Sequence, residues 1–179
     1  MEYPMKIILY HGFESSRKSS KYVFLEKYCT ERGYKLICDE VDHLSESVVS
    51  THVDRLSEEI NKWDDEIVLV GHSLGGYYAR YLSRRFGVKC LLINPCLNPE
   101  NYTKNRVNAS SYPLTDTVVL IDVNDGVLDM NAVYEELKDE TEIIKVYGDG
   151  HKFESSLDLI AIHLDGLINS YNLPLMDMD

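Results

Sequence analysis

Short apolar segments alternate with longer amphipathic segments along almost the whole chain. The apolar segments have the length of buried strands, and the amphipathic ones carry apolar side chains at helical spacing. We expect strands at Met5–Tyr10, Lys35–Cys38, Glu66–Val70, Val88–Ile93, Thr117–Val123 and Glu142–Tyr147. We expect helices at Arg17–Arg32, Ser45–Trp63, Leu74–Phe86, Met130–Lys138 and Ser156–Ser170. This order predicts an α/β fold, with a doubly wound, mainly parallel six-stranded sheet and helices on both faces.

The length of 179 residues predicts a single domain that spans residues 1–179. Residues 94–115 interrupt the alternation, because they contain three prolines, five asparagines and little periodicity. We expect them to form a short segment that resembles a cap or lid. Residues 172–179 are predicted to be an acidic tail.

The chain is strongly acidic, with 30 acidic and 18 basic side chains and a formal net charge of −12. This charge argues against binding to nucleic acid and to anionic membrane surfaces. The sequence has neither the roughly 18 consecutive apolar residues of a membrane span nor a basic leader, so we predict no membrane insertion and no signal peptide. The four cysteines are far apart in the sequence and are expected to be buried free thiols, which predicts a cytoplasmic location.

One serine lies between an expected strand and an expected helix and is surrounded by glycines, in the stretch Gly71-His72-Ser73-Leu74-Gly75. A sharp turn at Ser73 would expose its hydroxyl above the sheet, and the glycines would let the neighbouring backbone pass close by. This is the G-x-S-x-G pattern of the nucleophile elbow. The sequence therefore predicts that Ser73 is a catalytic nucleophile.

A serine hydroxyl needs a general base to become a strong nucleophile. Of six histidines, His151 follows the sixth expected strand and precedes the last helix, so it is the predicted base. The acid that orients it should follow the fifth strand. Asp125 is preferred, Asp122 is the alternative, and Asp129 is expected to be an N-cap.

The oxyanion that forms on a substrate carbonyl needs two hydrogen-bond donors. The predicted donors are the backbone amides of Leu74 and Phe13. Further residues are expected near the substrate: His11, Gly12, Tyr77 and Pro95.

Several stretches, in the same order, resemble the small bacterial esterases of the YqiA/YcfP-like family. These stretches are ILYHGFESS, GHSLGGYYA, INPCLNPENY, DGVLD and GDGHKF. The resemblance implies a compact α/β-hydrolase fold and serine esterase activity on short acyl esters, with no metal or organic cofactor. It also implies Ser73 as nucleophile, His151 as base and Asp125 as acid.

The expected function is that of a serine hydrolase, a carboxylesterase that cleaves small-molecule acyl esters through a Ser-His-Asp triad. Two alternatives remain open. A thioesterase or acyl transferase could use the same triad, and a non-catalytic binding protein could use the same fold.

Overall fold

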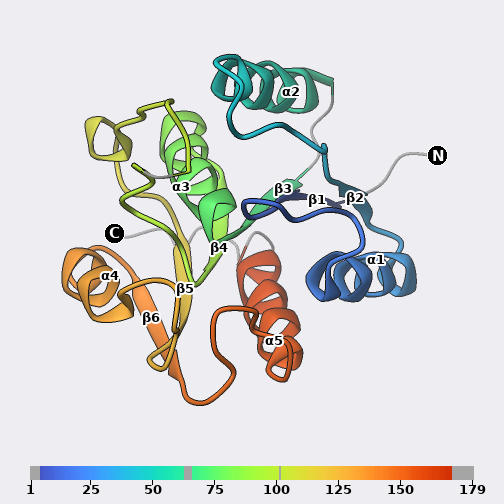
Figure 1. The fold of residues 1–179 in the computed structure, drawn as a ribbon. Coiled ribbons are helices and arrows are strands. Elements are labelled where there is room, and N and C mark those ends of the chain that lie inside the picture. The colour runs from blue at the N-terminus through green and yellow to red at the C-terminus, as the bar shows by residue number, and fades with distance from the viewer. Residues whose placement is uncertain (1–4, 63–65, 101, 171–179) are drawn as a thin grey trace, which may run out of the picture.

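The structure is a computed structural model that describes residues 5–62, 66–100 and 102–170. All six strands are parallel and lie in the order β2-β1-β3-β4-β5-β6 (Figure 1), which confirms the predicted fold class. The strands are β1 (Met5–Tyr10), β2 (Lys35–Ile37), β3 (Glu66–His72), β4 (Lys89–Ile93), β5 (Thr117–Asp122) and β6 (Glu142–Val146).

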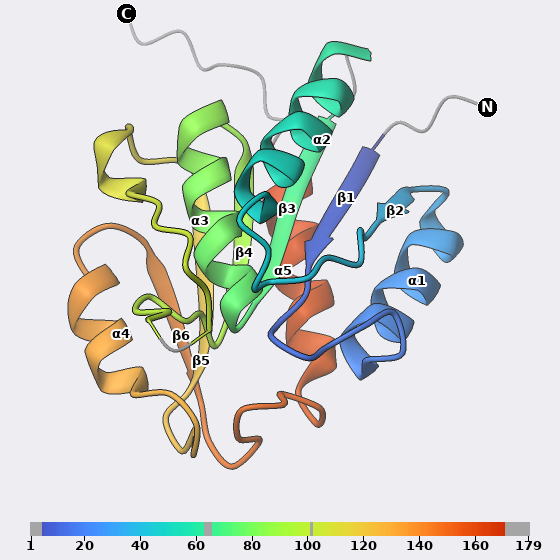
Figure 2. The ribbon, with the colours of Figure 1, turned by 45° about the horizontal axis from the view of Figure 1, so that its top comes forward.

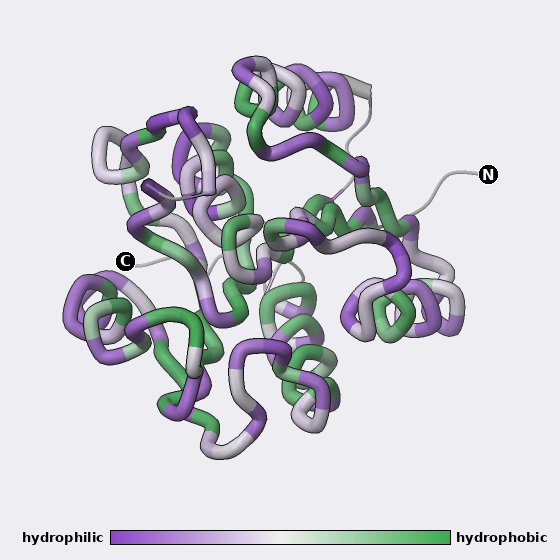
Figure 3. Tube along the Cα trace, in the orientation of Figure 1, coloured by the Kyte–Doolittle hydropathy of each residue, from purple (hydrophilic) through white to green (hydrophobic). Residues whose placement is uncertain are grey.

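Five helices in the described part of the chain cover the two faces of the sheet. They are α1 (Ser20–Arg32), α2 (Val48–Lys62), α3 (Leu74–Phe86), α4 (Met130–Leu137) and α5 (Leu157–Asn169). Helices α1 and α5 pack on one face, and α2, α3 and α4 pack on the other (Figures 1 and 2). The central strands are almost continuously hydrophobic (Figure 3), as expected for a parallel sheet that is buried on both faces.

Two helices begin three residues later than predicted. The side chain of Ser19 accepts a hydrogen bond from the amide of Tyr22, so Ser19 is the N-cap of α1. Ahead of α2, the hydroxyl of Ser45 bonds the amide and the hydroxyl of Ser47. In both places serine side chains bond the local backbone and delay the helix.

Strand β3 is two residues longer than predicted, because Gly71 and His72 pair with Leu92 and Ile93 of β4. Ser73 therefore lies directly after the end of β3 and directly before α3. This junction fixes the position of the predicted nucleophile.

Within the described residues of 94–115, a 3₁₀ turn forms at Ala109–Ser111, and the segment is hydrogen-bonded to α3. The hydroxyl of Tyr77 donates to the carbonyl of Val107 and accepts from its amide, at 3.1 and 2.9 Å. The hydroxyl of Tyr78 donates to Oγ1 of Thr103 at 2.9 Å. These bonds hold the segment against the helix along much of its length.

The four cysteines are buried free thiols, as predicted. No helix among the described residues is both long and apolar enough to cross a membrane. The predicted acidic tail at residues 172–179 lies outside the described part of the chain.

Candidate active site

Ser73 has a backbone conformation that side-chain-bearing residues rarely adopt, with φ of 54° and ψ of −123°. Its own amide donates to the carbonyl of Ile93, and its carbonyl accepts from the amides of Gly76 and Cys96. The turn is therefore held from both β4 and α3. Positive φ at a serine costs on the order of 1–3 kcal/mol, and strain of this kind is concentrated at functional sites.

Two glycines allow the elbow to form. A Cβ atom at Gly75 would lie 1.9 Å from the carbonyl oxygen of Tyr10, so only glycine lets α3 pack against the end of β1. A Cβ atom at Gly12 would lie 3.2 Å from the Cβ of Ser73. Gly12 thus brings the loop after β1 directly beside the serine.

His151 forms a short contact with Asp125, in which Nδ1 of the ring lies 2.7 Å from Oδ2 of the carboxylate. The Asp125 side chain is fully buried, and that of His151 is 20% exposed. The other oxygen of Asp125 accepts hydrogen bonds from the amides of Val127 and Leu128. A fixed, fully bonded carboxylate of this kind orients an imidazole and favours its Nδ1-H tautomer.

The other two candidate acids have different partners. Asp122 is buried and accepts hydrogen bonds from the amides of Asp149 and Gly150, which precede His151. Asp129 accepts from the amides of Asn131 and Ala132 and is the N-cap of α4. Of the three aspartates, only Asp125 contacts the histidine ring in the described structure.

The loop that carries His151 is also bonded from β3 and β4. Nε2 of His72 lies 2.9 Å from the carbonyl oxygen of His151. The amide group of Asn94 donates to the carbonyls of Gly150 and His151 at 3.0 and 3.4 Å. The segment between β6 and α5 thereby turns from the edge of the sheet toward its centre, as Figures 1 and 2 show.

No sequence pattern singles out His72 and Asn94 as supports for this loop. Asn94 does have one sequence signal, since it is a polar residue directly after a buried strand. No hydrogen bond joins the Ser73 hydroxyl to the ring of His151 in the described structure, and such bonds often tighten only when substrate is bound.

The two predicted oxyanion donors both flank Ser73. The amide of Leu74 is the first in α3, where the helix dipole favours negative charge. Phe13 follows Gly12, which abuts the serine. Among the described residues, neither amide donates a hydrogen bond within the protein.

The other predicted substrate residues have different surroundings. Pro95 packs against Gly76 and lines a cavity next to the elbow. Tyr77 lines a neighbouring hollow, but its hydroxyl is engaged by Val107. The ring of His11 is buried, with Nδ1 2.9 Å from the carbonyl of Gly12.

His11 belongs to a buried aromatic cluster on the α2 and α3 side of the sheet, together with Tyr10, His43, His52 and Tyr78. Burial and a nearby histidine lower the pKa of His43 to about 4 and that of His52 to about 4. Burial, with Lys21 and His151 nearby, lowers the pKa of His72 to about 3. These three histidines are therefore neutral at neutral pH.

The backbone of the site is strained at more than one position. Among the described residues, the non-glycine residues with positive φ are Glu14, Ser73, Asn94 and Phe153. Each of them lies in a segment that follows β1, β3, β4 or β6, at the carboxyl edge of the sheet. Ligands of open parallel sheets bind at this edge.

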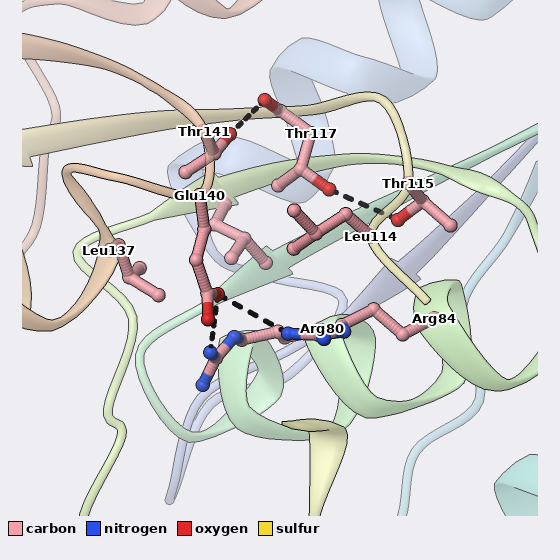
Figure 4. Close-up of a pocket in the computed structure, with 9 residues that line it drawn as sticks. Arg80, Arg84, Leu114, Thr115, Thr117, Leu137, Glu140 and Thr141 are labelled. Carbon is pink, nitrogen blue, oxygen red and sulfur yellow. Dashed lines mark hydrogen bonds and ion pairs between the residues drawn. The ribbon is translucent and has the colours of Figure 1, made fainter. Parts of the chain in front are cut away.

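Figure 4 shows a different cavity, at the amino ends of β5 and β6, where Arg80 and Arg84 share one carboxylate oxygen of Glu140. Arg84 also donates twice to the carbonyl of Tyr112. With a volume of about 10 Å³, the cavity is the size of one water. The cavity lies at the edge of the sheet opposite Ser73. The bonds from Arg84 to the carbonyl of Tyr112 help to hold residues 94–115 in place.

The sheet order and the turn after β3 define an α/β-hydrolase fold, and two solved structures are similar to it. Est1E from Butyrivibrio proteoclasticus superposes with a TM-score of 0.75 at 15% identity, over 94% of this chain and 88% of its own. An α/β serine hydrolase without a lid from Xanthomonas campestris superposes with a TM-score of 0.71 at 17% identity, over 97% and 84%. At these identities, the likeness shows the fold.

The family follows from the sequence. Residues 6–118 match the model of UPF0227, described as an uncharacterised protein family, and the chain belongs to this family. The chain is also 24% identical over 164 residues to a UPF0227 protein of Shewanella woodyi. This alignment covers 82% of this chain and 91% of the relative. The resemblance predicted from the motifs is confirmed, and the matched residues include Ser73 but not Asp125 or His151.

Proposed function

We propose that this protein is a serine hydrolase that cleaves small acyl esters. The observation that carries the proposal is the combination of Ser73 in a strained strand-to-helix turn with a His151 ring held by buried Asp125. The structural likeness to α/β hydrolases supports it at the level of the fold.

In the proposed reaction, His151 removes the proton from the Ser73 hydroxyl as the oxygen attacks the ester carbonyl. The amides of Leu74 and Phe13 donate to the oxyanion of the tetrahedral intermediate. His151 then gives the proton to the leaving alcohol, and an acyl-enzyme remains. Water, deprotonated by the same histidine, attacks the acyl-enzyme. The bond between the acyl group and the Ser73 oxygen then breaks, the histidine returns its proton to that oxygen, and the acid is released. Asp125 keeps the ring oriented and stabilises its protonated form, and no cofactor is required.

The first experiment measures hydrolysis of p-nitrophenyl acetate and butyrate by the wild type, Ser73→Ala and Ser110→Ala. A fluorophosphonate probe is applied to all three. We expect wild type and Ser110→Ala, a surface control on the 3₁₀ turn, to turn over and to label, and Ser73→Ala to do neither. If the wild type neither hydrolyses nor labels, the proposal is wrong.

The second experiment tests the histidine and its acid. His151→Gln should lower kcat by at least about 10³-fold, because the base is lost. Asp125→Asn should lower kcat almost as much, because the ring of His151 loses its orientation and its preferred tautomer. His163→Gln, on α5, is the matched control and should leave kcat unchanged. Equal activity of His151→Gln and His163→Gln would rule out His151 as the base.

A further inference from the structure

A cavity of about 240 Å³ lies at the carboxyl ends of β4 and β5, and we call it the β4–β5 cavity. One wall consists of residues 95–98 and Tyr102, and the other of residues 127–129 and one side of α4. We propose that it binds an uncharged, largely apolar chain of the ester substrate. The inference rests on the proposed function and names the substrate class of the same site.

Both walls are bonded directly to the catalytic candidates. In the first wall, the amide of Cys96 donates to the carbonyl of Ser73 at 2.9 Å. In the second wall, the amides of Val127 and Leu128 donate to the carboxylate of Asp125 at 2.7 and 3.0 Å. The walls of the cavity therefore adjoin the segments that carry the nucleophile and the acid, and the proposal is that a chain attached to the scissile carbonyl extends from Ser73 into it.

The lining selects against a negatively charged chain. Most of its side chains are apolar, including Leu97, Val127 and Val133. Its charged side chains are Asp129 and Glu136, and no basic residue of the described structure lines it. The net charge of −12 acts in the same direction. A carboxylate at the end of the substrate chain would meet like charges here.

A neighbouring hollow shares part of this lining and contains two arginines, but both are already paired. Arg80 donates to Glu136 at 3.1 Å and to Glu140 at 2.8 Å, and Arg106 lies 3.5 Å from Glu100. Two carboxylates hold the largely buried Arg80, and Arg106 is a solvent-exposed side chain, so the hollow offers no buried free cation among the described residues to hold an anionic chain.

The first test fills the cavity. Ala132 lines the cavity from α4, whereas its neighbour Asn131 does not, so we compare Ala132→Phe with Asn131→Phe. Substrates are p-nitrophenyl esters from acetate to hexanoate, and acetates of methanol, butanol and hexanol. Wild type should gain about fourfold in kcat/KM for each methylene that enters the cavity, in either the acyl or the alcohol series.

Ala132→Phe should remove most of this gain, so that the ratio of kcat/KM for the longest ester to that for the shortest falls toward one. Asn131→Phe should behave as wild type. If Ala132→Phe removes the gain in the acyl series, the acyl chain enters the cavity; if it removes the gain in the alcohol series, the alcohol chain does. Equal effects of Ala132→Phe on short and long esters, or no effect on any of them, would overturn the inference.

The second test addresses charge, with methyl hexanoate and monomethyl glutarate followed by titration of the released acid. We expect at least a tenfold lower kcat/KM for the anionic ester, a smaller difference in 0.5 M salt, and a smaller difference in Asp129→Asn, which retains the N-cap. A preference for the anionic ester would contradict the inference.

A binding measurement separates the inference from the proposed function. Calorimetry of methyl hexanoate with Ser73→Ala and with Ser73→Ala/Ala132→Phe needs no turnover. If methyl hexanoate binds to Ser73→Ala but not to Ser73→Ala/Ala132→Phe, the inference is supported even if no ester is hydrolysed. If it binds equally to both proteins, or to neither, the inference is wrong. Hydrolysis by the wild type tests the proposed function separately.

Discussion

The ring of His72 contacts the backbone of His151, with Nε2 of His72 2.9 Å from the carbonyl oxygen. The two rings are 5.2 Å apart between centroids. His72 precedes the predicted nucleophile and His151 is the predicted base, so one bond joins the segments that carry them. Because burial keeps His72 neutral, it places no second cation beside His151 when that ring takes up a proton.

We predict that His72→Gln retains most of the activity and that His72→Leu loses about 10- to 100-fold in kcat. A glutamine amide can still donate to the His151 carbonyl, whereas leucine leaves it with only the longer bond from Asn94. KM should change little, since the ring acts through the base and not on the substrate. Steady-state kinetics check this, and equal losses in two folded variants would contradict it.

The strain at Ser73 predicts an inverted order of stability for two inactive variants. Alanine is normally more favourable than glycine, by about 0.5–1 kcal/mol. At φ of 54°, glycine is unstrained and alanine is not. Ser73→Gly should therefore exceed Ser73→Ala in free energy of unfolding by about 1 kcal/mol, as measured in urea. The opposite order would show that the turn relaxes when the hydroxyl is removed.

Gly75 should tolerate no side chain. The Cβ atom of Gly75→Ala would meet the carbonyl of Tyr10 at 1.9 Å, so α3 or β1 must move. We expect a loss of more than about 3 kcal/mol in the free energy of unfolding, or failure to fold. Gly126→Ala is the control, because no atom lies within 4 Å of its added Cβ. Thermal unfolding of the two variants checks the contrast, and similar midpoints would refute it.

Stability should fall as the pH drops from about 6.5 to 4. His43 and His52, with pKa values near 4 in the folded state and about 6.5 in the unfolded state, bind protons preferentially when the chain is unfolded. Each group then contributes a loss of up to about 1.4 kcal/mol per pH unit within this window. Urea unfolding at pH 7.5, 6 and 5 measures the slope.

His52→Phe provides the comparison for this slope. It removes one titrating group, and phenylalanine can still meet the ring of Tyr10, which His52 contacts edge-on. The slope should be shallower than in the wild type. An unchanged slope would mean that His52 does not contribute to the acid sensitivity.

The sequence predicts the sheet well because parallel strands are buried on both faces and read as continuous apolar runs. The helix at Leu74–Phe86 was predicted to the residue. The starts of α1 and α2 were wrong, because the bonds that delay them come from serine side chains that periodicity does not register. β3 was too short in the prediction because Gly71 and His72 are poor strand formers, and their pairing with β4 outweighs this.

The candidate site was harder to predict from the sequence than the fold. Chain order and motif spacing sufficed to select Ser73, His151 and Asp125, and the structure places the last two in contact. The supports from His72, Asn94 and Asp122 depend on which loops meet above the sheet, which no local pattern encodes. The β4–β5 cavity also depends on two walls that are about 30 residues apart in the sequence, although both of its charged side chains come from the wall of residues 127–136.

The candidate site needs five neighbouring strands of the sheet in place. Gly12, Ser73 and His151 follow β1, β3 and β6, and β4 and β5 lie between β3 and β6 in the sheet. All the connections are crossovers between parallel strands, not hairpins, so the three segments meet only when strands far apart in the sequence have paired. Turnover by this protein would therefore report on assembly of the sheet from β1 to β6, and we expect a pair of chain fragments to regain it only by rebuilding that part of the sheet.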